Sequence, residues 1–332
     1  MFKKKPLRIN SYLGYGTTTR LRATGRALED ENINFDGNTG ILKTLRNIYK
    51  QFESDEIKKA HIELKLSNGQ KFSTATDSEG YYNFDELLSD SFELTDKEGW
   101  IPFIVSYQSG NDKRIIQNNV FEGKMLTPSE NATYGIISDI DDTILHTGVA
   151  SLFKWRVITN TFFKNFDRRL PLEGTVQFYQ KLKLGKNTAP VNPIFYVSNS
   201  PWNLYDYLTA FLKKHYFPEG PILLRDFRTP FDKTPKPKIP HKQSEILNLI
   251  KIYPNIKFIL IGDSGEKDAD IYTEIAIKYP NRILAIYLRS VNHKRKEKRI
   301  IKIIDSFTTT PILLVHSSKE AEEHARQHGF IT

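Results

Sequence analysis

The chain has 332 residues, of which 39% are hydrophobic, 26% charged and 12% aromatic. This is globular composition, and at roughly 150 residues per domain the length favours two domains. Cysteine is absent, which excludes disulfides, thiolate metal sites and cysteine nucleophiles. No apolar run approaches the roughly 18 residues of a membrane helix, so we expect a cytoplasmic, soluble protein without a cleaved signal. The 48 Lys and Arg residues exceed the 39 Asp and Glu residues, and the net charge of +9 indicates an anionic partner.

Residues 1–130 show mostly the period-two alternation of β-strands. Within 60–66 every second residue is apolar, and Asn68-Gly69 predicts a two-residue type I′ turn into a second strand at 71–75. The other predicted elements are one helix and three strands, at 41–52 and at 76–84, 101–107 and 114–121. We therefore expect a small antiparallel β-sandwich, which resembles transthyretin-like modules.

After Thr127-Pro128-Ser129 the pattern changes to short apolar runs that alternate with helical segments. The apolar runs are 134–138, 193–198, 256–262 and 283–288. The helical segments are 151–166, 176–184, 201–216 and one that begins near Lys242. Such alternation predicts an α/β fold, in which helices cover both faces of a Rossmann-like parallel sheet. The proline-rich stretch 217–241 is expected to be an irregular loop, and we predict domains at 1–130 and 131–332.

Polar side chains that can carry chemistry follow several of these runs. They are Asp139, Asp141 and Thr143 of a DxDxT pattern, Ser198 and Asn199, and Asp263 and Asp268 of the stretch GDSGEKD. A lone lysine, Lys242, opens a helix. In parallel sheets ligands bind beyond the carboxyl ends of the strands, so we expect these side chains to meet at one site.

These motifs together resemble a known enzyme family. They are SDIDDTILHTGV (138–149), YVSNSPWNLY (196–205), HKQSEIL (241–247) and FILIGDSGEKDADIY (258–272). Their order is that of the haloacid dehalogenase superfamily, and 134–331 most closely resembles the actin-patch-associated phosphatidate phosphatases. The stretch GYGTTTRLRATGRAL (14–28) is similar to the leader of that family. The resemblance implies a haloacid dehalogenase fold and hydrolysis of phosphatidate to diacylglycerol and phosphate.

Phosphoryl transfer needs a nucleophile, a proton donor and positive charge, and each has a candidate here. Asp139 is expected to attack phosphorus and form an aspartyl-phosphate. Asp141 projects to the same side of an extended strand and is expected to protonate the leaving oxygen, then deprotonate water. Mg²⁺ is expected to bind the Asp139 carboxylate, the Asp141 carbonyl and Asp263, with Asp268 at or beside these ligands.

The remaining motif residues are expected to contact the phosphoryl group. Ser198 and the N–H that follows it bind a phosphoryl oxygen, and Lys242 neutralises the phosphoryl group and the intermediate. Thr143 braces the loop, and Thr143 and Asn199 are counted with the residues that bind substrate. The intervals between the motifs are too short for a large lid, so we expect a minimal cap and an open site, which suits a substrate presented by a surface.

The positive charge is confined to the second domain. Residues 1–130 hold 18 basic and 19 acidic residues, so the remaining 30 basic and 20 acidic residues leave a net charge of +10 after residue 130. The basic clusters are Lys233, Lys236, Lys238 and Lys242, and Lys294, Arg295, Lys296, Lys298, Arg299 and Lys302. We expect the second cluster, with Lys294 and Arg295 among the substrate-binding residues, to contact an anionic membrane peripherally. An ordinary solvated helix face is the alternative.

Two other functions remain open from the sequence. The same chemistry could act on a phosphoprotein, a nucleic-acid end or a soluble phosphomonoester. The chain could instead be a lipid-binding module without catalysis. Nucleic-acid binding is not expected, because no aromatic-interleaved recognition motif accompanies the basic clusters. Protein partners are not indicated by the sequence.

Overall fold

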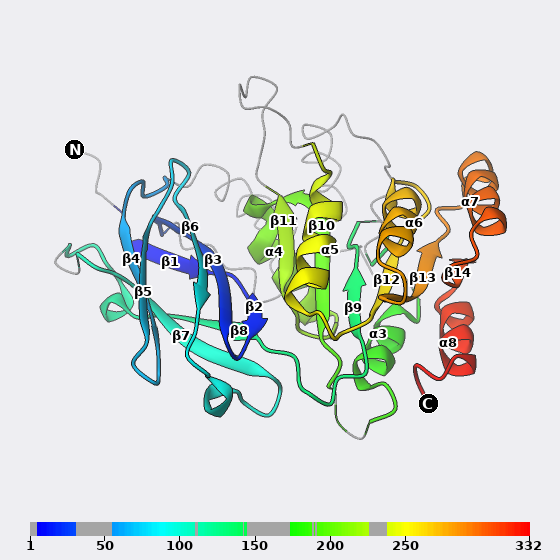
Figure 1. The fold of residues 1–332 in the computed structure, drawn as a ribbon. Coiled ribbons are helices and arrows are strands. Elements are labelled where there is room, and N and C mark those ends of the chain that lie inside the picture. The colour runs from blue at the N-terminus through cyan, green and yellow to red at the C-terminus, as the bar shows by residue number, and fades with distance from the viewer. Residues whose placement is uncertain are drawn as a thin grey trace. The chain divides into compact units, whose positions relative to one another are not determined.

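The structure is a computed structural model that describes residues 5–30, 55–109, 112–141, 143–144, 173–187, 189, 191–225 and 238–332 (Figure 1). The chain divides into two compact units, Met1–Ser129 and Glu130–Thr332. Each unit has its own sheet and its own buried side chains. Among the described residues, no helix has the length and apolar character needed to cross a membrane.

Eight strands of the first unit form one hydrogen-bonded sheet. They are β1 (Leu7–Ser11), β2 (Gly14–Thr17), β3 (Arg20–Glu29), β4 (His61–Leu66), β5 (Lys71–Ala75), β6 (Tyr81–Leu87), β7 (Trp100–Tyr107) and β8 (Phe121–Leu126). Their order is β1-β3-β2-β8-β7-β4-β5, and β6 pairs with β3. The pairs are antiparallel except β2 with β8. The prediction of an antiparallel sheet is confirmed with that exception, while the sandwich and the transthyretin-like comparison stay predictions.

The hairpin of β4 and β5 is confirmed, but its turn is not the predicted one. The N–H of Gly69 donates to the carbonyl of Leu66 (3.1 Å) and the N–H of Leu66 to that of Gln70 (3.0 Å), so the loop between the paired residues Leu66 and Gln70 has three residues, 67–69. A type I′ turn needs positive φ at both Asn68 and Gly69, and only Gly69 has it, at 89°. Asn68 instead accepts a hydrogen bond at its side-chain oxygen from the N–H of Gln70 (3.2 Å).

The strand predicted at 114–121 is wrong. A short 3₁₀ segment, η2 (Gln117–Asn119), interrupts it with positive φ at all three residues, and β8 begins only at Phe121. The cause is Asn119, whose side chain accepts from the N–H of Tyr107 (2.8 Å) and donates to its carbonyl (2.7 Å). One amide side chain therefore replaces a rung of the sheet. The helix predicted at 41–52 lies outside the described residues.

The second unit confirms the predicted parallel sheet with helices on both faces. The six strands run in the order β11-β10-β9-β12-β13-β14, and every pair is parallel. They are β9 (Gly135–Ser138), β10 (Ile194–Pro201), β11 (Ile222–Arg225), β12 (Phe258–Asp263), β13 (Ile283–Arg289) and β14 (Ile312–Val315). The helices are α3 (Thr175–Leu184), α4 (Tyr205–Lys214), α5 (His241–Ile252), α6 (Asp268–Lys278), α7 (Lys294–Ser306) and α8 (Ser318–Gln327).

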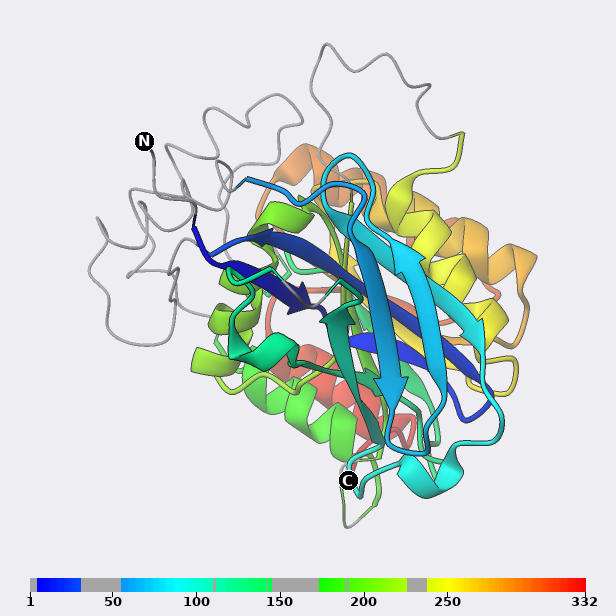
Figure 2. The same ribbon diagram turned by 90° about the vertical axis from the view of Figure 1, so that its left-hand side faces the viewer.

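The connections between the strands place α5, α6 and α7 on one face of the sheet and α3, α4 and α8 on the other (Figures 1 and 2). The helix predicted at 176–184 is confirmed as α3. The one predicted at 201–216 starts later, after a 3₁₀ turn, η4 (Trp202–Leu204), because β10 extends to Pro201. The proline-rich loop predicted at 217–241 contains β11, and 226–237 lie outside the described residues, as does the helix predicted at 151–166.

The strand order reverses at β9, and in sheets of this kind such a reversal forms a crevice at the carboxyl edge. From β9 the chain moves to β10 and β11 on one side, then returns to β12 and β13 on the other. All four residues of β9 are buried, and its neighbours hold it on both edges. Ligands of such sheets bind where the strand order reverses, so the structure directs attention to the residues that follow β9.

Candidate active site

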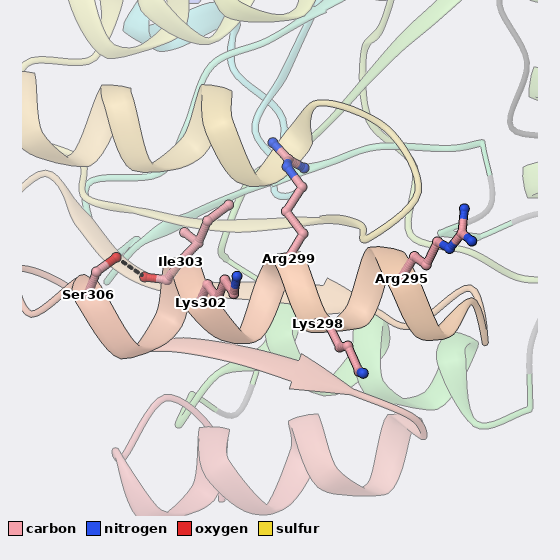
Figure 3. Close-up of a pocket in the computed structure, with 6 residues that line it drawn as sticks. All are labelled: Arg295, Lys298, Arg299, Lys302, Ile303 and Ser306. Atoms are coloured by element: carbon pink, nitrogen blue, oxygen red, sulfur yellow. Dashed lines mark hydrogen bonds between the residues drawn. The ribbon is translucent and has the colours of Figure 1, made fainter.

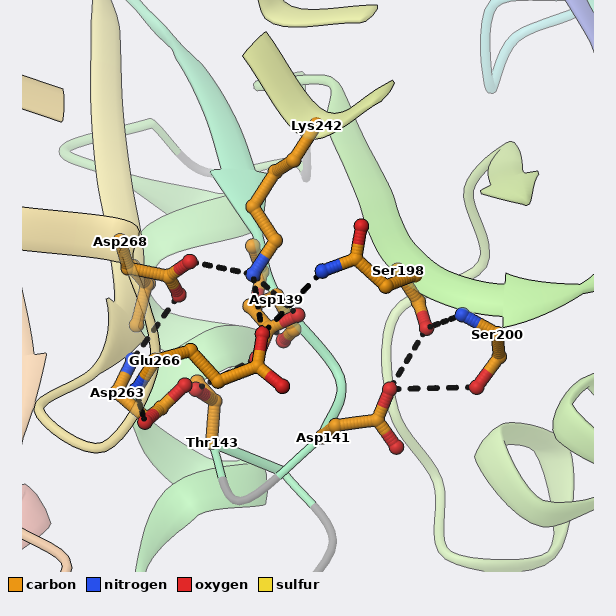
Figure 4. A network of polar contacts seen from close by, with 12 residues as sticks. Asp139, Asp141, Thr143, Ser198, Ser200, Lys242, Asp263, Glu266 and Asp268 are labelled. Atoms are coloured by element: carbon orange, nitrogen blue, oxygen red, sulfur yellow. Dashed lines mark hydrogen bonds and ion pairs between the residues drawn. The ribbon is translucent and has the colours of Figure 1, made fainter. Parts of the chain in front are cut away.

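Asp139 lies directly beyond β9 at this crevice (Figure 4). Its side chain is only 1% exposed. Asp139 Oδ1 is 3.0 Å from Lys242 Nζ, and Oδ2 accepts a hydrogen bond from Thr143 Oγ1 (3.2 Å). Thr143 therefore holds the carboxylate in place, while its expected roles in bracing the loop and binding substrate stay predictions.

Lys242 is a buried cation among carboxylates. It lies in the first turn of α5, and its Nζ is 2.5 Å from Asp268 Oδ1 and 3.7 Å from Glu266 Oε2. Burial by itself lowers the pKa of Lys242, but the charges of Asp139 and Asp268 outweigh this and raise it well above the ordinary value. The lysine therefore stays protonated and supplies positive charge beside Asp139.

Three buried carboxylates lie close enough to hold one metal ion. An oxygen from each of Asp139, Asp263 and Asp268 lies within 4.8 Å of the others. Asp263 ends β12, and its Oδ1 accepts hydrogen bonds from the N–H groups of Gly265 and Glu266. Its Oδ2 is buried and has no hydrogen-bond partner among the described residues. A buried oxygen without a donor is the arrangement expected of a metal ligand.

The electrostatics of this cluster also call for a cation. Burial raises the pKa of Asp139 well above its usual range; Lys242 opposes the rise, and Asp268, Asp141 and Asp263 add to it. Burial and the charge of Asp268 likewise raise the pKa of Asp263. Lys242 alone cannot keep these acids ionised together, so the residues present fit a divalent cation held by oxygen ligands.

Asp141 makes a separate set of contacts on the other side of Asp139. Its Oδ2 accepts hydrogen bonds from Ser198 Oγ (2.7 Å) and Ser200 Oγ (3.3 Å), and Ser198 Oγ accepts one from the N–H of Ser200 (2.9 Å). These serines lie in β10, the neighbour of β9. The Asp141 carboxylate is thus held by two serines and is not among the three acids that could hold a metal.

The structure adds Glu266 and Ser200 to the predicted residues. Asn199 Nδ2 donates to Glu266 Oε2 (3.2 Å), so this contact joins β10 to the loop after β12. Burial raises the pKa of Glu266, Lys242 opposes the rise, and Asp268 and Asp141 support it. Both residues stand inside quoted motifs, and only their neighbours in space distinguish them from solvated loop residues.

Lys294 and Arg295 lie elsewhere. Both are exposed at the start of α7. No hydrogen bond or ion pair connects either of them to the Asp139 site within the described residues. The nearer member of their cluster is Lys296, whose Nζ donates to the carbonyl of Gly265 (2.8 Å) in the loop after β12.

Comparison with known proteins agrees with these motifs. Residues 134–290 match the family model described as phosphatidate phosphatase APP1, catalytic domain. This segment belongs to the APP1 family. It holds β9 to β13 and therefore all the residues of the site.

Two related proteins extend the comparison. The chain is 38% identical over 168 residues to phosphatidate phosphatase APP1 of Saccharomyces cerevisiae, a match that covers 49% of this chain and 27% of that protein. It is 31% identical over 222 residues to an uncharacterized protein of Schizosaccharomyces pombe, covering 67% of this chain and 35% of that protein. The matches thus span about a third or less of either relative.

Proposed function

We propose that this protein is a phosphatidate phosphatase, which hydrolyses phosphatidate to diacylglycerol and phosphate. One observation carries the proposal: in the segment of the APP1 family, the buried carboxylate of Asp139 lies 3.0 Å from the buried Lys242 ammonium, at the carboxyl end of β9. The pair combines a nucleophile with the positive charge that phosphoryl transfer requires.

In the first step a carboxylate oxygen of Asp139 attacks phosphorus, and the bond from phosphorus to the glycerol oxygen breaks. Asp141 gives its proton to that oxygen, and diacylglycerol leaves. Lys242 neutralises negative charge on the phosphoryl group beside Asp139. The product on the enzyme is an aspartyl-phosphate.

In the second step water attacks the phosphorus of this intermediate. Asp141, now ionised, takes a proton from the water, the bond from phosphorus to Asp139 breaks, and phosphate is released. Ser198 and Ser200 hold the Asp141 carboxylate at 2.7 and 3.3 Å, which keeps one group in position for both proton transfers.

Mg²⁺ is the proposed cofactor, held by the carboxylates of Asp139 and Asp263 and the backbone carbonyl of Asp141. Asp268 is placed beside these ligands and not among them, because its two oxygens already accept hydrogen bonds, one from Lys242 and one from the N–H of Asp263 (3.2 Å). When bound, the ion supplies positive charge to the phosphoryl oxygens.

The direct test is phosphate release by the full chain in the presence of Mg²⁺. Phosphatidate in mixed micelles is compared with p-nitrophenyl phosphate, and we expect the lipid to be strongly preferred. Asp139→Asn should reduce the rate by about a thousandfold or more. Asp305→Asn, which changes an exposed acid at the end of α7, serves as the matched control and should keep full activity.

The test also separates the alternatives. Preference for the soluble ester would assign the same chemistry to another phosphomonoester. Binding to phosphatidate vesicles without release of phosphate would make the protein a non-catalytic lipid-binding module.

We propose peripheral contact with an anionic membrane through α7. The side chains of this helix line a surface hollow, at Arg295, Lys298, Arg299, Lys302, Ile303 and Ser306 (Figure 3). Arg299 forms an ion pair with Asp270 of α6, which partly neutralises it, and the ammonium group of Lys296 donates to the carbonyl of Gly265. Lys294, Arg295, Lys298 and Lys302 remain as charges for lipid headgroups, at about 1 kcal/mol each, and the last three line the hollow.

The proposed domains, cap and cellular location rest on the same family resemblance as the proposed function. We propose a β-sandwich domain at 1–130 and a haloacid dehalogenase-like phosphatase domain with a minimal cap at 131–332. The division into the units Met1–Ser129 and Glu130–Thr332 supports these bounds. We propose a cytoplasmic, peripherally membrane-bound location. The residues between the motifs at 145–172, where a cap would be inserted, lie outside the described part of the chain, as do Lys233 and Lys236 of the first basic cluster.

A further inference from the structure

Arg225 occupies a position in the crevice that no motif indicated. It is the last residue of β11, and it pairs in register with Pro201 of β10. Pro201 directly follows Ser200, whose hydroxyl donates to Asp141. The sheet thus places Arg225 at the same carboxyl edge as Asp139, on the side of the crevice where Asp141 lies.

The guanidinium of Arg225 lacks the partners that a half-buried arginine normally has. Its Nε is buried and forms no hydrogen bond, and no described carboxylate lies within ion-pair distance of it. Two other half-buried arginines in this unit differ. Arg282 also has a buried Nε without a partner, but its Nη2 donates to three backbone carbonyls, and Arg289 donates to the hydroxyls of Thr175 and Ser318. A buried donor without an acceptor is uncommon, and Arg225 stands beside a site that binds anions.

The surrounding charges keep this arginine available to a ligand. Burial lowers the pKa of Arg225, and the negative charges of Glu266 and Asp141 oppose the shift. A guanidinium stays protonated under such conditions, since its ordinary pKa is far above neutrality. Glu266 accepts a hydrogen bond from Asn199, and Asp141 accepts hydrogen bonds from the serines of β10. Neither carboxylate forms an ion pair with Arg225 among the described residues.

Lys242 is differently placed. It is fully buried, and its ammonium group is shared by Asp139 and Asp268. An entering phosphate monoester brings up to two negative charges into a crevice that already holds several carboxylates. A second cation with uncommitted N–H groups would lower that repulsion, and the planar guanidinium matches two oxygens of a phosphate.

We propose that Arg225 is a substrate-binding residue that donates hydrogen bonds to the non-bridging oxygens of the substrate's phosphate group. Its role is distinct from that of Lys242, because it contacts the phosphate without touching Asp139. The assignment deepens the proposed function, and it rests on that function only for the identity of the ester that carries the phosphate.

Binding of inorganic phosphate tests the contact without requiring turnover. Isothermal titration calorimetry with Mg²⁺ present compares the full chain with Arg225→Gln and Arg225→Lys. Arg326→Gln, which removes an exposed arginine of α8, is the matched control. We expect Arg225→Gln to weaken phosphate binding about tenfold or more, Arg225→Lys to recover part of the loss, and Arg326→Gln to bind as the unaltered protein does. Circular dichroism and the melting temperature establish that each variant is folded.

A second arm measures hydrolysis of phosphatidate in mixed micelles, where Arg225→Gln should raise KM by a factor similar to its loss of phosphate affinity. Equal phosphate binding by Arg225→Gln and the unaltered protein would overturn the assignment, as would an unaltered protein that binds no phosphate. A raised KM for phosphatidate with unchanged phosphate binding would overturn it too, because Arg225 would then contact another part of the lipid. Arg225-dependent phosphate binding in a protein that does not hydrolyse phosphatidate would leave the assignment standing and reject the proposed function.

Discussion

Lys242 Nζ lies 3.0 Å from Asp139 Oδ1, and both side chains are 1% exposed. The two residues are far apart in the sequence and come from α5 and the end of β9. A buried ion pair of this kind constrains both the stability and the chemistry of the site, because neither charge can be left alone without a large desolvation cost.

Lys242→Met should therefore destabilise the protein by about 3–5 kcal/mol, since Asp139 and Asp268 lose their shared cation. Asp268→Asn introduced together with Lys242→Met should restore part of that loss, because it removes one of the uncompensated charges. Urea unfolding measures both effects. Lys251→Met, an exposed change on the same helix, should stay within about 0.5 kcal/mol of the unaltered protein. Equal stability of the Lys242 and Lys251 variants would contradict the burial of the pair.

Mg²⁺ should raise the melting temperature of the protein, because an ion that binds only the folded state stabilises it. At about ten times its dissociation constant the ion adds about 1.4 kcal/mol. Asp263→Asn should abolish the rise, because it replaces a charged carboxylate, whose buried Oδ2 has no partner among the described residues, with an uncharged amide. Thermal unfolding with and without Mg²⁺ is the measurement, and Asp305→Asn is its control. A full Mg²⁺ response in Asp263→Asn would show that the ion binds elsewhere.

Neutralising α7 should weaken binding to membranes. The triple change of Arg295, Lys298 and Lys302 to Gln removes three charges and should lower sedimentation with phosphatidate-containing vesicles by about tenfold or more at low salt. A control triple change of Lys213, Lys214 and Lys251 to Gln alters the net charge equally at other exposed positions. If both sets lower vesicle binding alike, net charge accounts for it and α7 has no special part.

Asp85 should make the stability of the first unit depend on acid pH. Arg20 and Arg22 donate to its carboxylate, each with a contact of 2.7 Å. Arg20 lowers the pKa of Asp85, burial opposes this, and Arg22 lowers it further, so that the pKa falls to about 2. Because the pKa in the folded protein is below the ordinary aspartate value of 3.8, the contribution is present above pH 4 and is lost as the pH falls towards 2. Solvent screening limits it to on the order of 1 kcal/mol.

Asp85→Asn should remove that contribution, so its difference from the unaltered protein should shrink between pH 5 and pH 2. Unfolding by urea at several pH values measures the change, with Glu93→Gln as an exposed control. A destabilisation by Asp85→Asn that does not vary over this range would contradict the ion pairs.

The architecture of the second unit follows from local sequence patterns. Continuous apolar runs predict strands buried on both faces, and the amphipathic segments between them predict the covering helices. The predictions failed where contacts between distant residues decide the backbone. The side chain of Asn119 hydrogen-bonds to the backbone of Tyr107 in place of a neighbouring strand. β11 lies within a proline-rich stretch and was not predicted, because only its pairing with β10 makes it a strand.

The same division holds for the site. The sequence by itself determined the identities and order of Asp139, Asp141, Lys242 and Asp263, because each stands in a short motif next to a strand or helix end. Only the tertiary structure decided which partners each side chain has. Lys242 contacts two buried acids, and Asp141 is held by the serines of β10. The Nε of Arg225 is buried without a hydrogen-bond partner among the described residues. Burial and partners are properties of elements packed together, and spacing along one chain does not contain them.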